Sequence, residues 1–196
     1  DLILSSRFAT KEDLKLSIKT NSNNEKITDL FAGNAKPLVK KYDFIKGFEG
    51  GYLKFDSIEK NKVSNSNLKI FDFKLKEVPA LTKLLTLASL QGIADLLTGE
   101  GIRFNEFEMI FNNKAGLMTI EEIYSLGPSI SILMDGYIQK DDLVSLRGTL
   151  VPATTVNKVI GSIPLIGDIL VGKKAGEGVF GVSFKIKGYP DDLKTT

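Results

Sequence analysis

The residue types that usually perform catalysis are sparse in this chain. Its 196 residues include no histidine and no cysteine. Without histidine, the usual general base near neutral pH and the commonest metal ligand are missing. Without cysteine, there is no thiol nucleophile, thiolate metal site or disulfide. We therefore expect no catalytic residue, no metal site, no cofactor and no enzymatic activity.

Two short motifs that carry chemistry in other proteins occur here in the wrong setting. Residues 176–181 fit the G-x-G-x-x-G pattern of a dinucleotide site. That site needs the motif to open a helix, whereas here it opens a strand-like segment, so we interpret it as a turn. Ser57 and Lys60 fit S-x-x-K, but residues three apart on a strand point to opposite faces, which rules out a serine–lysine catalytic pair. The adjacent carboxylates Glu121 and Glu122 are interpreted as surface charges.

The charge pattern predicts no nucleic-acid partner. With 26 basic and 24 acidic residues, the formal net charge is only +2. The lysines are spaced one or two residues apart along alternating segments, which is typical of solvated strand faces and not of a phosphate-binding groove. Asp135 and Arg147 lie in otherwise apolar segments, so we expect them to pair across a sheet.

The sequence is typical of one segment, residues 1–196, of a longer protein. Asp1–Leu4 lacks the basic start of a signal peptide, and the chain begins in strand-like alternation without an initiator methionine. We therefore expect the true N-terminus to lie elsewhere. The nearest candidate for a membrane span, Val159–Val171, is interrupted by Pro164 and Asp168 and falls short of the ~18–20 apolar residues that cross a bilayer.

Alternation of apolar and polar residues dominates the chain and predicts strands. Turn-like breaks and short connections between these segments predict an antiparallel meander of about seven to nine strands. Residues 1–40 are expected to be less regular than the rest. The expected strands are Leu14–Lys19, Gly51–Ile58, Leu68–Glu77, Ile102–Asn112, Leu117–Leu126, Ile130–Ile138, Leu143–Val151 and Val179–Lys187.

Two segments break the alternation and predict helical insertions. Pro79–Leu97 opens with proline, closes at Gly99 and is apolar around most of a helix, so protein or lipid must cover it. Val156–Val171 predicts a second, short helix. The expected fold class is thus mainly β with two helical insertions (α+β), in which a curved antiparallel sheet carries the helix at 79–97 on its apolar face.

The order and spacing of several segments carry a family resemblance. The segments include Phe71–Leu81, Leu87–Phe104, Gly127–Ser129, Asp135–Gly136, Gly148–Ala153, Ile163–Leu170 and Gly176–Val182. With a family-like core at residues 67–190, they cover about two-thirds of the chain. Together they resemble the C-terminal region of the AsmA-like family of bacterial envelope proteins, and most closely its YhdP-type members.

This resemblance implies a part of an elongated β-groove with an apolar inner face. Proteins of this family are anchored in the inner membrane, cross the periplasm and are thought to carry phospholipid towards the outer membrane. The resemblance therefore implies a periplasmic location, membrane contact through the full-length protein, and a protein partner in the envelope. The chain departs from the family pattern because it lacks the anchor and most of the groove and stops at Pro190–Lys194, so we expect it to be a fragment.

The residues themselves leave two interpretations open for the apolar sheet face. If it lines a groove, phospholipid acyl chains contact it. If the helices seal it, the segment is a structural cap or docking module for outer-membrane assembly with no lipid path of its own. No headgroup site can be recognised in either case. The groove-face candidates are Phe71, Phe73, Leu75, Phe107, Met109, Phe111, Ile132 and Met134.

Overall fold

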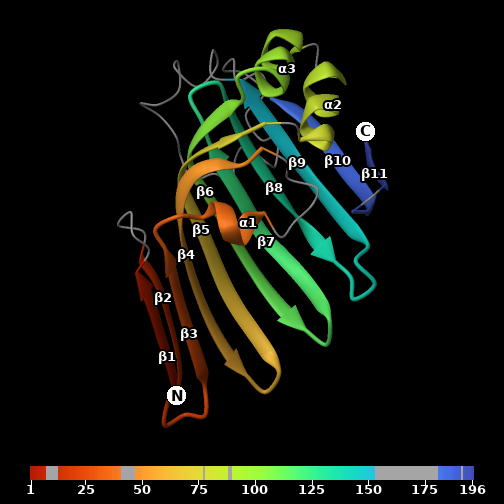
Figure 1. Cartoon of the computed structure of the whole chain (residues 1–196). Coiled ribbons are helices and arrows are strands. Elements are labelled where there is room, and N and C mark those ends of the chain that lie inside the picture. Colours follow the sequence, from red (N-terminus) through yellow and green to blue (C-terminus); the bar gives the residue numbers. More distant parts are fainter. Residues whose placement is uncertain (8–12, 41–46, 77, 88–89, 153–180, 191) are drawn as a thin grey trace, which may run out of the picture.

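One open antiparallel sheet with short helices makes up the described part of the protein. The computed structural model describes residues 1–7, 13–40, 47–76, 78–87, 90–152, 181–190 and 192–196. They form eleven strands in the order β1 to β11, each hydrogen-bonded to the next in the chain, and three short helices (Figure 1). This arrangement confirms the mainly β fold class and the antiparallel meander, with more strands than the predicted seven to nine.

The bounds of the strands agree best with prediction in the middle of the chain. Two strands, β7 and β8, have the predicted bounds, whereas residues 1–40 are more regular than expected and contain the first three strands. The strands are β1 Leu2–Arg7, β2 Asp13–Thr20, β3 Lys26–Ala32, β4 Glu49–Lys60, β5 Val63–Leu75, β6 Ile102–Lys114, β7 Leu117–Leu126, β8 Ile130–Ile138, β9 Val144–Pro152, β10 Val182–Tyr189 and β11 Asp192–Thr195. The helices are α1 Lys36–Val39, α2 Pro79–Leu87 and α3 Gln91–Thr98.

The strand register sorts the side chains into two faces. Leu53 of β4 pairs with Ile70 of β5, which pairs with Phe107 of β6. Directly paired residues project to the same side of a sheet, and successive residues along a strand project to opposite sides. We call the side that carries these three residues the inner face and the other side the outer face.

A buried core joins the inner face to the helices. Side chains of α2 and α3 pack in one cluster with the sheet, and α2 also contacts β11. In Figure 1, α2 and α3 lie together at one end of the sheet, next to β9 and β10. We call this end the helix end. The opposite end, which carries the β2–β3, β4–β5, β6–β7 and β8–β9 turns, is the turn end. The core includes Leu81, Leu84, Leu85 and Ala94 from the helices and Ile102, Phe104, Ile130, Leu150 and Phe184 from the sheet.

The single helix predicted at 79–97 is divided into two helices. At Leu90 the backbone leaves the helical region, with φ −99° and ψ 46°. The N–H of Leu90 instead donates to the carbonyl oxygen of Leu85 at 2.8 Å. A straight helix that is apolar on most sides would leave one side exposed, whereas two shorter helices that pack together cover each other. The predicted stop is confirmed, because α3 ends at Thr98 before Gly99. The second predicted helix, 156–171, lies outside the described residues.

Candidate lipid-binding face

A row of apolar side chains crosses the inner face from strand to strand. Its members are register partners of one another, and glycine is the only one without a side chain. The nine residues span eight strand spacings of about 4.8 Å, so the row is roughly 38 Å long. That length exceeds the ~30 Å hydrocarbon core of a bilayer. We call it the central row; from β2 to β10 it contains Leu16, Leu30, Phe55, Leu68, Met109, Ile123, Met134, Gly148 and Phe184.

A second apolar row runs beside the central row, one step nearer the helices. Its only polar member is Ser125, whose hydroxyl donates to the carbonyl oxygen of Glu106 at 3.4 Å. The inner face therefore presents two adjacent apolar rows across nine strands. This second row contains Leu14, Ala32, Leu53, Ile70, Phe107, Ser125, Ile132, Leu150 and Val182.

Burial decreases from the helix end towards the middle of the inner face. Leu150 is fully buried in the row nearer the helices. In the central row, Leu68, Met109 and Met134 are only partly buried, although Ile123 and Phe184 are buried. Covering apolar surface is worth roughly 25 cal/mol per Å². The central row therefore offers surface that an apolar ligand would gain free energy by covering.

Five of the eight sequence-predicted residues lie together on the inner face. On β6 they are Phe107, Met109 and Phe111, and on β8 they are Ile132 and Met134. Strand β7 lies between these two strands. All five are partly buried. The prediction that they share one face is confirmed.

The prediction that Phe71, Phe73 and Leu75 share this face is wrong for Phe71. Phe71 is the register partner of Tyr52 and Glu106, so it lies on the outer face. Its ring stacks on the Tyr52 ring with a centroid distance of 4.9 Å.

The other two residues of this group belong to the helix end. Phe73 is 4% exposed, and its ring stacks between Phe48 and Phe104 at centroid distances of 5.3 and 5.4 Å. Leu75 pairs with Ile102 and packs against the core. Neither residue joins the partly exposed central row.

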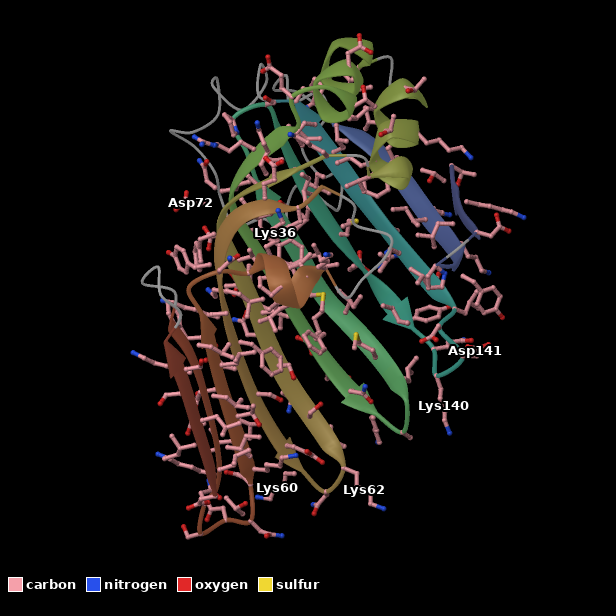
Figure 2. All side chains as sticks on the ribbon, viewed as in Figure 1. Lys36, Lys60, Lys62, Asp72, Lys140 and Asp141 are labelled. Carbon is pink, nitrogen blue, oxygen red and sulfur yellow. The ribbon has the colours of Figure 1, made fainter. Side chains whose placement is uncertain are left out.

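The departure from simple alternation on β5 has a local backbone cause. Asp72 adopts φ 53°, a left-handed conformation that non-glycine residues rarely take and that asparagine and aspartate tolerate best. The register pairs on both sides of Asp72 are unchanged, but Asp72 itself has no partner on β4 or β6. The strand bends there, and Figure 2 shows Asp72 at the edge of the molecule.

Pairwise alternation in the sequence could not reveal all residues of the central row. The predicted strands contain Phe55 and Leu68, yet only the register shows that they meet Met109. Leu30 was missed because Lys26–Ala32 does not alternate cleanly. Finding these residues requires the register between strands, which the alternation within one strand does not give.

The outer face carries cross-strand ion pairs, one of which was predicted from the sequence. Arg147 and Asp135 pair across β8 and β9, with Nε 3.0 Å from Oδ2, as predicted from the sequence. Lys69 and Glu108 form a similar pair at 3.0 Å. Burial, and then the neighbouring glutamate charges, raise the pKa of the Tyr124 phenol above its ordinary value.

The serine–lysine motif has no catalytic geometry. Ser57 lies on the inner face with its Oγ 2.9 Å from the Oγ of Ser66. Lys60 projects to the other face and forms an ion pair with Glu25 at 3.0 Å, and Figure 2 shows it near Lys62 at the β4–β5 turn. Among the described residues there is no group of three or more side chains suited to hold a metal ion. The glycine motif 176–181 lies outside the described residues except at its last position.

Comparisons with known proteins leave the family assignment as a prediction. No protein-family model matches this chain, and neither does any curated protein or solved structure. Within the described residues, no helix has the length and apolar character needed to cross a membrane. The functional argument therefore depends on the geometry of the inner face.

Proposed function

We propose that this chain is a non-catalytic segment of an AsmA-like, bridge-type lipid transfer protein of the bacterial periplasm. In this proposal its inner face contacts the acyl chains of phospholipids that move between the inner and outer membranes. Attachment to the membrane belongs to the full-length protein, and so does any protein partner in the envelope. The chain itself needs no cofactor and performs no covalent chemistry.

The observation that carries the proposal is the continuous central row. It crosses nine strands without a charged side chain. Its members on β2 to β6 are only partly buried, whereas Ile123 on β7 is 5% exposed. Acyl chains require apolar contact along their length and few specific polar groups. A row roughly 38 Å long on an open sheet supplies such contact.

A cap or docking module is the second candidate, and the helix pair favours it. Leu84 and Leu85 of α2 and Ala94 of α3 are buried in the same core as Leu150 and Phe184 of the sheet. The helices thus cover the inner face at one end. If that cover served only to close the sheet, the segment would bind no lipid.

Native mass spectrometry of detergent-free protein separates the two candidates. The proposed function predicts co-purified phospholipid, visible as discrete mass additions that organic extraction removes. A chain that carries no lipid after expression in a bacterial periplasm, and takes none up from vesicles, would favour the cap.

Matched substitutions on β6 locate the contact. Met109→Asp places a carboxylate on the partly exposed inner face, and Ile110→Asp places one on the outer face at the next residue, where the side chain is 37% exposed. Both variants should remain folded because the charge stays hydrated. Only Met109→Asp should lose crosslinking to a photoreactive phospholipid.

A third variant shows what a charge at a fully buried position does to the fold. Leu150→Asp would bury an unpaired charge at a fully buried position and should unfold the protein, since such burial costs several kcal/mol. If Met109→Asp unfolds the protein as Leu150→Asp does, the central row is ordinary core and the proposed lipid contact is wrong.

A further inference from the structure

The inner face becomes polar towards the turn end on strands β3 to β6. Beyond the central row, the next two rows on β3 to β6 carry hydroxyl, amide and charged groups at every position except Phe111 of β6. We call this region the polar shelf. It contains Thr28 and Lys26 of β3, Ser57 and Glu59 of β4, Ser66 and Ser64 of β5, and Asn113 of β6.

Proximity to the turns does not explain the polar shelf. On β7 to β9 the same two rows are apolar, although these strands end in turns as well. Ile138 and Val144 pair directly beside the β8–β9 turn, just as Glu59 and Ser64 pair near the β4–β5 turn. The apolar members are Met118, Ile120, Ile138, Val144 and Leu146. The change in polarity is therefore a property of one half of the face.

A cation and an anion lie side by side on the shelf. The Nζ of Lys26 is 3.2 Å from Oε2 of Glu59, and the two side chains are 51% and 43% exposed. Next to them, Ser57 and Ser66 share a hydroxyl hydrogen bond of 2.9 Å. An exposed ion pair contributes only about 0–1 kcal/mol, so either partner can exchange it for another charge at little cost.

The spacing of the rows matches the layers of a phospholipid. Rows on one face lie two residues apart along a strand, or about 6.8 Å. The headgroup layer on each side of a bilayer is roughly 5–8 Å thick, half the difference between the total thickness and the hydrocarbon core. A lipid whose acyl chains lie on the central row would therefore have its headgroup over the polar shelf.

We infer that the polar shelf binds the headgroup of a zwitterionic glycerophospholipid, with Lys26 facing the phosphate and Glu59 facing the ammonium group. The ammonium of lysine binds phosphate as a point charge, and an ionised carboxylate accepts hydrogen bonds from an ammonium donor. This inference rests on the proposed function, because it requires acyl chains on the central row. It adds the lipid's orientation and the charge class of its headgroup.

Three photoreactive lipids with identical acyl chains test the inference: a phosphatidylethanolamine, a phosphatidylglycerol and a diacylglycerol, each presented in the same non-ionic detergent. Lys26→Glu should lower crosslinking of both phospholipids by about fivefold, the factor that corresponds to the upper value for an exposed charge pair, and leave the diacylglycerol unchanged. Glu59→Lys should shift the preference from phosphatidylethanolamine to phosphatidylglycerol.

The outer-face pair supplies the matched control. Lys69→Glu reverses a lysine that also forms a cross-strand ion pair at 3.0 Å, and it should change none of the three yields. Lys26→Gln is a milder second variant should Lys26→Glu lower the melting temperature. If Lys26→Glu leaves the yields of all three lipids as they are in the parent, or if Lys69→Glu has an effect as large, the headgroup inference is overturned while the proposed function stands. Absence of crosslinking of every lipid to the unmodified chain would overturn both.

Discussion

Phe71 and Phe73 lie two residues apart on β5, and replacing each with alanine should have unequal consequences. Phe73 is 4% exposed between two stacked rings, and truncation of a buried phenylalanine costs about 3–5 kcal/mol. Phe71 is partly exposed and has one stacked neighbour, Tyr52, and a lysine 6.0 Å from its ring centre. These contacts are worth about 1–2 kcal/mol together.

Thermal and urea unfolding followed by circular dichroism measure the difference. In a protein of this size, 1 kcal/mol shifts the melting temperature by about 2–4 °C. Phe73→Ala should therefore melt about 6–20 °C below the parent, and Phe71→Ala about 2–8 °C below it. Equal losses for the two variants would refute the assignment of Phe71 to the outer face and the role given to Asp72.

Three further outcomes follow from the packing and the charges. Gly148→Ala should lower the free energy of unfolding, measured in urea, by about 1–3 kcal/mol, because a methyl group there would overlap the carbonyl oxygen of Leu133. An unchanged urea midpoint would contradict the close approach of β8 and β9. The side chains of Arg147 and Asp135 are 73% and 24% exposed, so a double-mutant cycle should give a coupling free energy of about 0–1 kcal/mol that salt weakens. A larger coupling free energy that does not depend on salt would contradict a solvated pair. The raised pKa of Tyr124 means that the folded state holds the phenol proton more tightly than the unfolded chain does. Stability should therefore fall as pH rises above the ordinary tyrosine pKa, and this fall should be smaller in Tyr124→Phe.

The sequence predicted the elements whose signal is local. Strands β7 and β8 alternate cleanly and are bounded by turn residues, so their limits could be predicted from the sequence. The Asp135–Arg147 pair could also be predicted, since two opposite charges in neighbouring apolar strands gain from facing each other. In both cases the information lies within a few residues or within one hairpin.

The missed features depend on contacts that are distant in sequence or on single backbone angles. Strands β1 to β3 bury few side chains and their alternation is weak, so the sequence predicts less regular structure in residues 1–40. The break at Leu90 and the bend at Asp72 each result from one residue outside the regular conformation. The polar shelf depends on the register of four strands, and sequence alternation does not specify which residues of different strands meet.

The continuity of the apolar rows also depends on an irregularity in β7. Ile120 and Ile123 are three residues apart, so a regular strand would place them on opposite faces. The register shifts between them, which leaves two residues of β7 opposite one residue on each neighbouring strand. Both isoleucines are consequently buried on the inner face, at 3% and 5% exposure.

The same bulge accounts for the two glutamates between these isoleucines. Glu122 pairs with the outer-face residue Ile110, and Glu121 accepts a hydrogen bond of 3.1 Å from the side chain of Asn112. Both carboxylates therefore lie on the outer side, which confirms the interpretation of this pair as surface charges. A regular β7 would have brought one carboxylate into the rows that cross Met109 and Phe111. The bulge thus keeps charge away from the surface on which the proposed function depends, at the point where the two halves of the sheet meet.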